Sequence, residues 1–332
     1  MSALFDRLSE DARARLRRRA QPRWIDPALA TLVHEPFSAA DWLFEPKLDG
    51  ERCLIFKRGG EVRILSRNRK DLGDTYPELV RAVAEQPGED LVLDGEIVAF
   101  RGGVSSFARL QQRMQAGPGA ASGPRVPVRC YVFDVLHAAG HDVTPLPLRE
   151  RKKLLPGALD LRDPLRRTPY VNSRGEDYHA RACRSGWEGV LAKDATSAYA
   201  RGRSRTWLKF KCVNNQEVVI GGFTEPTGSR PALGALLIGY YEDRRLVYGG
   251  KVGTGFDDAT LRDLRRRLDE LERSRSPFAG DVDERRAHWV APRLVAEVAF
   301  TEWTDDGKLR HPSYHGLRRD KDPAEVVREI PA

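Results

Sequence analysis

The stretch Phe44–Arg52, with the sequence FEPKLDGER, sets a lysine, a carboxylate, a glycine and an arginine within six residues, between two apolar runs that read as strands. In an extended segment Lys47 and Asp49 point to the same face, and Gly50 permits a positive-φ turn that brings Arg52 back toward the group that Lys47 contacts. A lysine amine is a nucleophile only when it is neutral, and burial or cationic neighbours favour that form. The alternative is a surface lysine in a turn, because such short motifs have high false-positive rates.

Two later segments place polar or aromatic side chains in runs that are otherwise apolar. Residues 91–100 read as a strand in which Asp94 and Glu96 share a face. A buried carboxylate needs a partner, so a cation or a sugar hydroxyl is implied. Residues 130–136 are apolar enough for a central strand, in which Phe133 is either a core residue or a platform for a base.

The segments around Glu188 and Lys209 suit phosphate chemistry. Glu188 stands at the entry to an apolar strand. In residues 206–211, period-two alternation sends Lys209 and Lys211 to one face and the apolar side chains to the other. Two ammonium groups on one face need an anion between them, although a strand with one solvated face has the same pattern. Five basic residues within 201–211 favour the phosphate interpretation.

The length and the charge distribution indicate two domains with different net charges. The chain has 332 residues and 40% apolar content, enough for two cores. Residues 1–212 carry 37 Lys+Arg against 27 Asp+Glu, whereas residues 213–332 carry 19 against 21, and the net charge is +8. The first part therefore holds the positive field, which suggests a polyanionic partner.

No apolar run approaches the ~20 residues of a membrane span, and the N-terminus lacks the ~7–15-residue apolar region of a secretory signal. We therefore expect a soluble cytoplasmic protein without a membrane partner. The four cysteines, Cys53, Cys130, Cys183 and Cys212, form no CxxC pair, which argues against a zinc ribbon and against a disulfide framework. Three of them lie in strand-like segments and are expected in the core.

The elements that position these residues can be placed coarsely. Residues 3–19 predict an amphipathic helix with a basic end, which is either an arm on nucleic-acid phosphates or a solvated face. A hairpin is expected at 53–57 and 62–66 across Gly59–Gly60, then a helix at 76–86 and a flexible loop at 116–127.

The second domain, residues 213–332, is predicted to be a small β-barrel. Strands are expected at 218–223, 235–241, 246–252 and 294–300, with the second and third joined across residues 242–245. Asp257 or Asp258 can cap a helix that carries a leucine stripe, Leu261, Leu264, Leu268 and Leu271.

Seven segments, taken in order, resemble the motif set of the covalent nucleotidyltransferases, and most closely the small bacterial ATP-dependent DNA ligases of end joining and repair. The segments are Lys47-x-Asp-Gly-x-Arg52, Ser66-Arg67, Asp94-Gly-Glu96, Tyr131-Val-Phe133-Asp134, Glu188-Gly, Lys209-x-Lys211 and Arg318-x-Asp320-Lys321. The resemblance implies an α+β fold: an adenylation domain of antiparallel sheets with flanking helices at residues 1–212, followed by an OB-fold barrel. It also implies ATP and Mg²⁺ or Mn²⁺ as cofactors.

The resemblance assigns a role to each matching residue. Lys47 is the expected nucleophile for the α-phosphate of ATP. Around the nucleoside, Phe133 stacks on adenine, Glu45 accepts from its exocyclic amine, and Glu96 and Arg52 contact the ribose.

The remaining matches surround phosphates. Lys209 and Lys211 hold the α-phosphate and activate Lys47, while Arg52 and Arg67 also contact the phosphate of the nick. Glu188 is the expected metal-site carboxylate, with Glu96 as a second one. Arg318, Asp320 and Lys321 are expected to orient the pyrophosphate leaving group.

The implied partner is nicked or broken duplex DNA, bound by a monomer associated with the bacterial nucleoid. We expect a minimal enzyme whose grip on a nick needs a partner, and the candidates are a Ku-type end-binding protein and a repair polymerase. Three alternatives stay open. The first is an RNA ligase, which is a close relative. The second is an mRNA capping guanylyltransferase, which uses GTP. The third is a non-enzymatic nucleic-acid-binding module, which would have lost some of the charged motif positions, and all of these positions are filled here.

Overall fold

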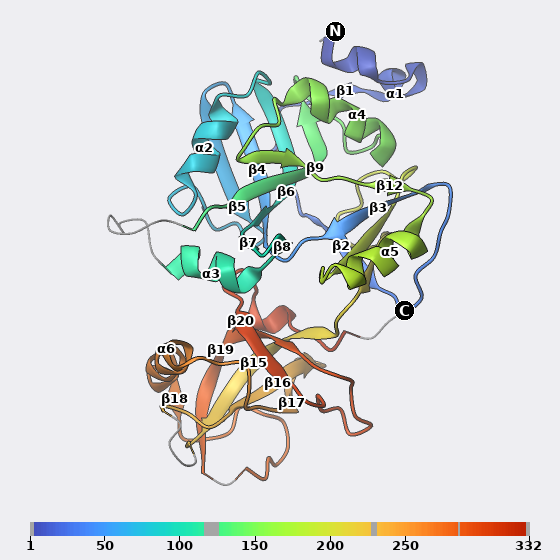
Figure 1. The fold of residues 1–332 in the computed structure, drawn as a ribbon. Helices are drawn as coiled ribbons and strands as arrows, with labels where there is room; N and C mark the ends of the chain where they lie inside the picture. Colours follow the sequence, from blue (N-terminus) through green and yellow to red (C-terminus); the bar gives the residue numbers. More distant parts are fainter. Residues whose placement is uncertain (1–2, 116–125, 227–230, 285, 330–332) are drawn as a thin grey trace. The chain divides into compact units, whose positions relative to one another are not determined.

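The computed structural model describes residues 3–115, 126–226, 231–284 and 286–329 (Figure 1). The chain divides into two compact units, the first ending at Cys212 and the second beginning at Val213. Both units are built mainly from antiparallel sheets with flanking helices, so the predicted α+β class is confirmed. The predicted loop at 116–127 lies, except for its last two residues, outside the described residues.

Two sheets form the first unit. The larger has the strand order β1 (Arg17–Arg18), β10 (His141–Asp142), β9 (Arg129–Ala138), β6 (Asp90–Val98), β4 (Glu51–Arg58) and β5 (Glu61–Ser66), with β11 (Leu165–Arg167) parallel to β9. The smaller has the order β12 (Val171–Asn172), β3 (Trp42–Lys47), β13 (Gly189–Asp194), β14 (Gly202–Lys211) and β2 (Ala28–Leu32). A short hairpin, β7 (Phe100–Arg101) and β8 (Val104–Ser105), follows β6.

The helices and sheets of this unit form four layers, because alternate residues of each strand enter different cores. The outer face of the larger sheet packs against α2 (Pro77–Ala84), α3 (Phe107–Gln115) and α4 (Leu148–Ala158). A second core lies between the sheets and includes Leu54 and Phe133 from the larger sheet and Trp207 from the smaller. The far face of the smaller sheet packs against α5 (Gly175–Arg184) through Phe44, Leu208 and Phe210.

The predicted hairpin is present, with β4 and β5 joined at Arg58 and Glu61 and with Gly59 at φ 56°. The prediction of one helix over 3–19 is wrong. A 3₁₀ helix, η1 (Ala3–Arg7), is followed by α1 (Glu10–Arg15), because the Ser9 hydroxyl accepts from the Ala12 N–H and starts a new helix. Arg17 and Arg18 then form β1.

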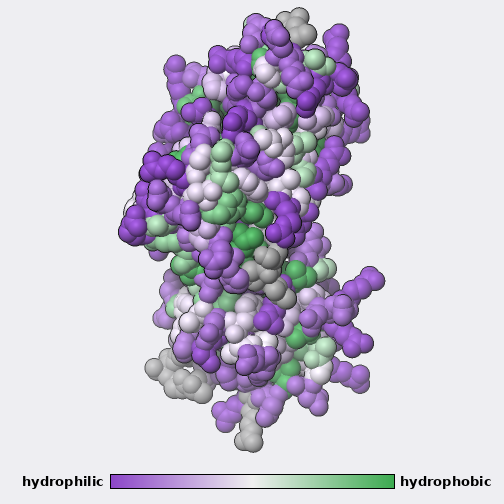
Figure 2. All heavy atoms as spheres, turned by 90° about the vertical axis from the view of Figure 1, so that its right-hand side faces the viewer, coloured by the Kyte–Doolittle hydropathy of each residue, from purple (hydrophilic) through white to green (hydrophobic). Residues whose placement is uncertain are grey.

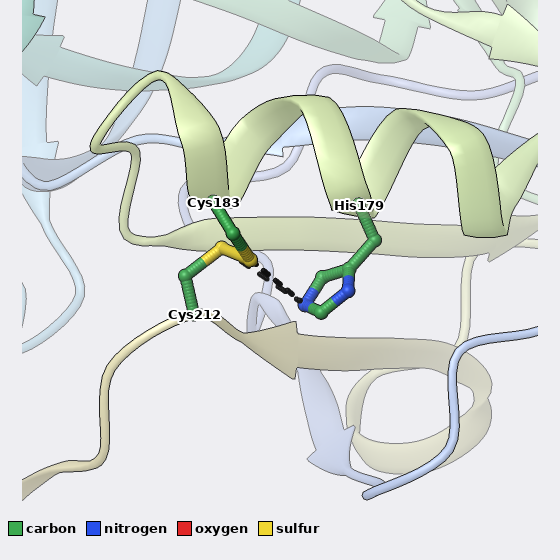
Figure 3. The surroundings of a disulfide bond; sticks show 3 residues. All are labelled: His179, Cys183 and Cys212. Carbon is green, nitrogen blue, oxygen red and sulfur yellow. Dashed lines mark hydrogen bonds between the residues drawn. A yellow bond between two sulfur atoms is a disulfide. The ribbon is translucent and has the colours of Figure 1, made fainter.

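The cysteine prediction needs one correction. Cys53 and Cys130 are buried in the core as expected. Cys183 of α5 and Cys212 are instead joined by a disulfide bond (Figure 3), across a sequence separation of 29 residues. Cys212 is therefore a cross-link at the end of the first unit and not an isolated core thiol.

The second unit is a barrel built from a six-stranded antiparallel sheet. Its sheet runs β17 (Arg245–Val252), β16 (Leu236–Glu242), β15 (Asn215–Thr224) and β19 (Ala287–Ala299), with β18 (Glu272–Arg273) and β20 (Ser313–Leu317) both paired to β19. A bridge between Thr254 and Ser313 links the chain just past β17 to β20 and closes the barrel. A 3₁₀ turn, η2 (Pro323–Glu325), follows. This curled antiparallel arrangement confirms the predicted OB-fold.

The local predictions for this unit also hold. Asp257 caps α6 (Asp258–Asp269) by accepting from the Thr260 N–H at 2.7 Å. Leu261, Leu264 and Leu268 of that helix are buried in the barrel core. The turn between β16 and β17 consists of Asp243 and Arg244, both at positive φ, which matches a two-residue hairpin loop.

Hydrophilic side chains cover most of the face shown in Figure 2, as expected for a chain in which 31% of residues are charged. Among the described residues, no helix has the length and apolar character needed to cross a membrane.

Candidate active site

Three neighbouring strands of the smaller sheet place Lys47 and Lys211 in one row. Lys47 ends β3 and pairs in register with Gly189 of β13, which pairs in turn with Lys211 of β14. Gly189 contributes no side chain between them. A Cβ at this position would lie 2.0 Å from the carbonyl oxygen of Phe210, so the close approach of β13 and β14 requires glycine.

Lys209 lies in the next row, where it pairs with Leu191, which pairs with Glu45. Leu208 and Phe210 enter the core beneath α5. By alternation Lys209 and Lys211 face the opposite side, as the sequence predicts. One face of the smaller sheet therefore carries Lys47 and both lysines of the 209–211 pair.

Lys47 forms an ion pair with Glu188, the residue immediately before β13. The two side chains are 20% and 12% exposed, so both can be reached from solvent. The Cys212 N–H donates to the Glu188 carbonyl oxygen at 3.0 Å and fixes this segment beside the end of β14. The ion pair occupies the Lys47 ammonium, so Lys47 must leave the Glu188 carboxylate before its amine can approach a phosphate.

Glu45 is buried between two lysines on the same face. It pairs with Lys152 of α4 and with Lys193 of β13, the latter at 2.6 Å. Burial raises the pKa of Glu45, but the two ammonium groups outweigh it and leave that pKa lowered. Burial also lowers the pKa of Lys193 to about 8, and the Glu45 carboxylate offsets only part of this effect.

Arg52 of β4 is clamped by a carboxylate of the larger sheet. Its Nε and Nη2 donate to the two oxygens of Asp94 at 2.5 and 2.7 Å, and the Tyr199 hydroxyl donates to the same carboxylate at 2.5 Å. Burial alone lowers the pKa of Arg52, but Asp94 raises it well above its usual value. Asp94 thus has the cationic partner that the sequence implied.

Phe133 lies against two cations. The Arg52 guanidinium carbon is 4.7 Å and the Lys193 Nζ is 4.0 Å from its ring centroid. The residue is only 4% exposed. A base can stack on this ring only after one of these side chains moves, since the structure buries it as a core residue.

Glu96 lies between Arg52 and Tyr131 in the register of β4, β6 and β9. All three are partly exposed, which distinguishes Tyr131 from the buried Phe133 two residues along the same strand. Arg67 is at the turn after β5, where the Ser66 hydroxyl accepts from the Lys70 N–H at 3.1 Å.

The turn glycine has a different function from the one expected. Gly50 lies outside the positive-φ region. A Cβ there would lie 2.3 Å from the carbonyl oxygen of Ile97, so glycine is needed where the chain after Lys47 passes β6. Asp49 accepts from the Phe107 N–H at 2.7 Å and so holds the start of α3.

In the second unit, Arg318, Asp320 and Lys321 form a network after β20. Arg318 donates to both oxygens of Asp320, at 3.0 and 2.8 Å, and to Glu297 at 2.8 Å. Lys321 pairs with Glu217 at 2.7 Å. Burial raises the pKa of Asp320, but Arg318 outweighs it and lowers that pKa to about 2.

The Glu188 carboxylate of the first unit has the donor chemistry that a hard divalent cation prefers. Magnesium and manganese prefer carboxylate oxygens. The Glu188 carboxylate already holds a cation, the Lys47 ammonium, and remains partly exposed. Glu96 offers a second carboxylate, on the larger sheet.

The structure thus gathers the predicted residues in three places. Lys47, Glu45, Glu188, Lys209 and Lys211 meet on the smaller sheet, Arg52, Glu96 and Phe133 on the larger one, and Arg318, Asp320 and Lys321 in the second unit. Sequence reasoning missed Lys152, Lys193 and Tyr199. Lys193 could have been recognised, because it is a charged residue that ends an apolar strand segment. Nothing near Lys152 or Tyr199 in the sequence marks them as the partners of Glu45 and Asp94.

Comparison with known proteins gives concordant matches. The family model described as the ATP dependent DNA ligase domain matches residues 27–211, and the one described as the ATP dependent DNA ligase C terminal region matches residues 229–321. The multifunctional non-homologous end joining protein LigD of Pseudomonas aeruginosa is 40% identical over 320 residues, which cover 94% of this chain and 37% of that protein. The multifunctional non-homologous end joining DNA repair protein LigD of Mycobacterium tuberculosis is 39% identical over 300 residues, covering 88% and 38%. This chain therefore spans little more than a third of the length of these two relatives.

A solved structure, described as mycobacterial DNA ligase D complexed with ATP and MES, matches with a TM-score of 0.66 and 35% identity. The match covers 92% of this chain and 98% of that one.

Proposed function

This chain belongs to the ATP-dependent DNA ligases, and from that membership we propose that it joins a 5′-phosphate to a 3′-hydroxyl in nicked or broken duplex DNA. The reaction has three steps. The Lys47 amine attacks the α-phosphorus of ATP, forms a P–N bond and releases pyrophosphate. The AMP then moves to the 5′-phosphate of the DNA, and finally the 3′-hydroxyl attacks that phosphate and releases AMP.

One observation carries this proposal: Lys47, Lys209 and Lys211 lie on one face of the smaller sheet, with Gly189 between two of them. A phosphate bound by Lys209 and Lys211 would sit beside the Lys47 amine. Displacement at phosphorus depends mainly on positioning and charge neutralisation, and this arrangement supplies both. The cationic neighbours also favour the neutral form of Lys47.

Glu188 links the nucleophile to the divalent cation. Magnesium or manganese, when bound, would neutralise charge on the phosphates. Glu188 would hold it, with Glu96 as a second carboxylate. Engagement of Glu188 in this way would release Lys47 from its ion pair.

The nucleoside would lie toward the larger sheet. Arg52 and Glu96 are proposed to contact the ribose, Glu45 the exocyclic amine of adenine, and Phe133 its ring. Binding at the last two requires rearrangement, because Glu45 is enclosed by Lys152 and Lys193 and Phe133 by two cations. Arg67 is proposed to contact the phosphate of the nick.

Arg318, Asp320 and Lys321 are proposed to orient pyrophosphate in the first step. The geometry supports different roles for these three residues. Asp320 is buried and holds Arg318 through two hydrogen bonds. It is therefore a positioning residue, while Arg318 and Lys321 supply the positive charge.

The biological setting proposed for this enzyme is bacterial end joining or excision repair at the nucleoid, in the cytoplasm. The relatives named for non-homologous end joining favour the first pathway. A Ku-type end-binding protein or a repair polymerase is the proposed partner, and the enzyme is proposed to act as a monomer.

The experiment that tests the proposal separates it from an RNA ligase and from a guanylyltransferase. The protein is incubated with α-labelled ATP or GTP and a divalent cation without DNA, then run on a denaturing gel. Label from ATP alone, in an acid-labile and base-stable bond, is expected, and a chase with nicked DNA or nicked RNA identifies the strand that is sealed. Label from GTP would instead assign the chain to the capping reaction.

A further inference from the structure

A second cluster of reactive side chains lies on the other face of the smaller sheet. Cys212 continues the alternation of Leu208 and Phe210, so its sulfur lies toward α5. His179 and Cys183 stand one helical turn apart on α5 and point to the same place (Figure 3). No role in the proposed ligation uses these three residues.

The three side chains are close enough to share one ligand. The His179 Nε2 lies 3.5 Å from the sulfur of Cys183 and 3.9 Å from the sulfur of Cys212. All three ligand atoms lie within 4.8 Å of one another, and each residue is half-buried. The ring of His179 is also held edge-on by Phe210, with 6.0 Å between the ring centroids.

These distances match tetrahedral zinc coordination. Zinc bonds of about 2.0–2.1 Å to nitrogen and 2.3 Å to sulfur place a nitrogen and a sulfur ligand about 3.6 Å apart, and two sulfurs about 3.8 Å apart. The histidine is therefore already at ligand distance from both sulfurs. Only the two sulfurs must separate, and they do so when the disulfide is reduced.

We propose that the reduced protein binds one Zn²⁺ ion through His179, Cys183 and Cys212, with water as the fourth ligand. A dithiol reductant supplies two electrons and two protons to the disulfide, which becomes two thiols while the reductant becomes a disulfide. Zinc then binds both sulfurs as thiolates, and the two thiol protons pass to water.

The site fastens the end of β14 to α5 within the first unit in either redox state. Cys212 is the last residue of the first unit and follows Lys211 directly. Its N–H donates to the carbonyl oxygen of Glu188, so the same short segment adjoins two proposed active-site residues. The disulfide ties this segment to α5 covalently, and zinc ties it by coordination.

The test measures metal uptake by the full chain and does not depend on ligase activity. Protein is reduced with dithiothreitol, freed of the reductant under nitrogen, and titrated with Zn²⁺ in competition with a chromophoric chelator. One equivalent per chain is expected for the reduced protein and none for the oxidised protein. Titration with Co²⁺ should give the thiolate charge-transfer and visible bands of a tetrahedral site.

Substitutions locate the site. Cys183→Ser and Cys212→Ser should each abolish stoichiometric uptake, and His179→Gln should weaken it by about tenfold or more. His315→Gln, an exposed histidine in the second unit, is the matched control and should bind as the wild type does. The oxidised and reduced wild-type proteins can be compared without any substitution, so a variant that fails to fold leaves the test intact.

Two results would overturn the proposal. One is reduced wild-type protein that takes up no more zinc than the oxidised protein. The other is Cys183→Ser or Cys212→Ser protein that retains full uptake.

Discussion

The charged clusters of the two units differ in how tightly they are held. In the first unit the Lys47–Glu188 pair is partly exposed at the end of a strand, on a part of the chain with an excess of basic residues. In the second unit Arg318 is 12% exposed, and the two carboxylates that bind it, Asp320 and Glu297, are more buried than Glu188, at 4% and 7% exposed. The excess of basic residues is absent there, since Asp and Glu slightly outnumber Lys and Arg.

This difference shows that two motifs made of similar residue types can be held with different rigidity. The nucleophile proposed at Lys47 must leave Glu188 during the reaction, and a partly exposed pair suits that role. Arg318 is proposed only to orient a leaving phosphate, a role that gains from a rigid setting, and its two hydrogen bonds to Asp320 provide one. Both segments look alike in the sequence, as short runs of lysine, arginine and aspartate.

The largest effect is expected at Lys47, the proposed nucleophile. Lys47→Ala should reduce self-adenylation by roughly 1,000-fold or more, because it removes the amine proposed to form the P–N bond. Lys47→Arg should fail as well, since arginine stays protonated. The measurement is label from α-labelled ATP on a denaturing gel. Lys153→Ala, which removes another lysine paired with a glutamate, Glu150, is the control and should keep wild-type activity. Labelled Lys47→Ala protein would contradict the assignment.

The second effect should separate the reaction steps. Asp320→Ala removes the clamp on Arg318, so self-adenylation should fall by about 100-fold, while sealing of a nick that already carries 5′-AMP stays nearly unchanged. Loss of a buried partner also costs about 3 kcal/mol of unfolding free energy. Both assays and a thermal melt are run on one preparation.

Lys321→Ala is the companion variant, because its pair with Glu217 is more exposed and its loss should cost about 1 kcal/mol or less. It should show the same split between steps with little change in melting temperature. Equal loss of both steps in the two variants would mean that the cluster supports the fold or grips DNA, and the leaving-group role would be withdrawn.

A smaller effect is expected from the buried Lys193 in the first unit. Its pKa is about 8 in the folded protein, below the ordinary value of 10.5, because burial disfavours the charged form. Between these values the unfolded chain binds more protons, so this group makes stability rise with pH from about 8 to 10.5. Lys193→Met should abolish this rise in the free energy of unfolding, which amounts to a few kcal/mol at most. Urea unfolding at several pH values measures it, and parallel curves for the two proteins would refute the prediction.

The smallest effect concerns the difference in charge between the units. Arg201, just before β14, and Arg205, within it, are exposed, and Arg201→Gln and Arg205→Gln should each lower the salt slope of binding to nicked duplex by about 0.9 if each contacts one phosphate. Arg275→Gln, exposed in the second unit, should leave the slope unchanged. Fluorescence anisotropy at a series of salt concentrations is the measurement, and equal slopes for all the variants would show that the basic excess of the first unit is incidental. Deletion of residues 1–19 is not a clean test, since Phe5, Leu8 and Ala12 lie in the core.

Local features of the fold were predictable because the signals for them lie close together in the sequence. The β4–β5 hairpin follows from Gly59 between two apolar runs, and α6 follows from a cap and a leucine stripe. The same holds for the two faces of β14, which alternation assigns correctly. The N-terminal segment was predicted less well, because its apolar spacing is continuous across Ser9, whose hydroxyl interrupts the helix.

Pairings between distant segments were not predictable from a single sequence. Glu45 reads as a motif residue, and nothing near it shows that α4 and β13 each bring a lysine to it. The burial of Phe133 depends in the same way on Arg52 and Lys193. The Cys183–Cys212 bond requires α5 to lie on the end of β14, which only the tertiary packing reveals.

The closure of the barrel has a consequence for local unfolding. At the closure, an isolated bridge joins the chain just past β17 to β20: the Tyr314 N–H donates to the Thr254 carbonyl at 2.9 Å, and the Thr254 hydroxyl to the Pro312 carbonyl at 3.2 Å. The long ladder between β15 and β19 runs from Asn215 to Thr224 on the other side of the barrel. Amide hydrogens at this bridge should therefore exchange with solvent sooner than those of the ladder. Since Arg318 directly follows β20, the same hydrogen-exchange experiment shows whether this part of the second unit opens before the ladder does.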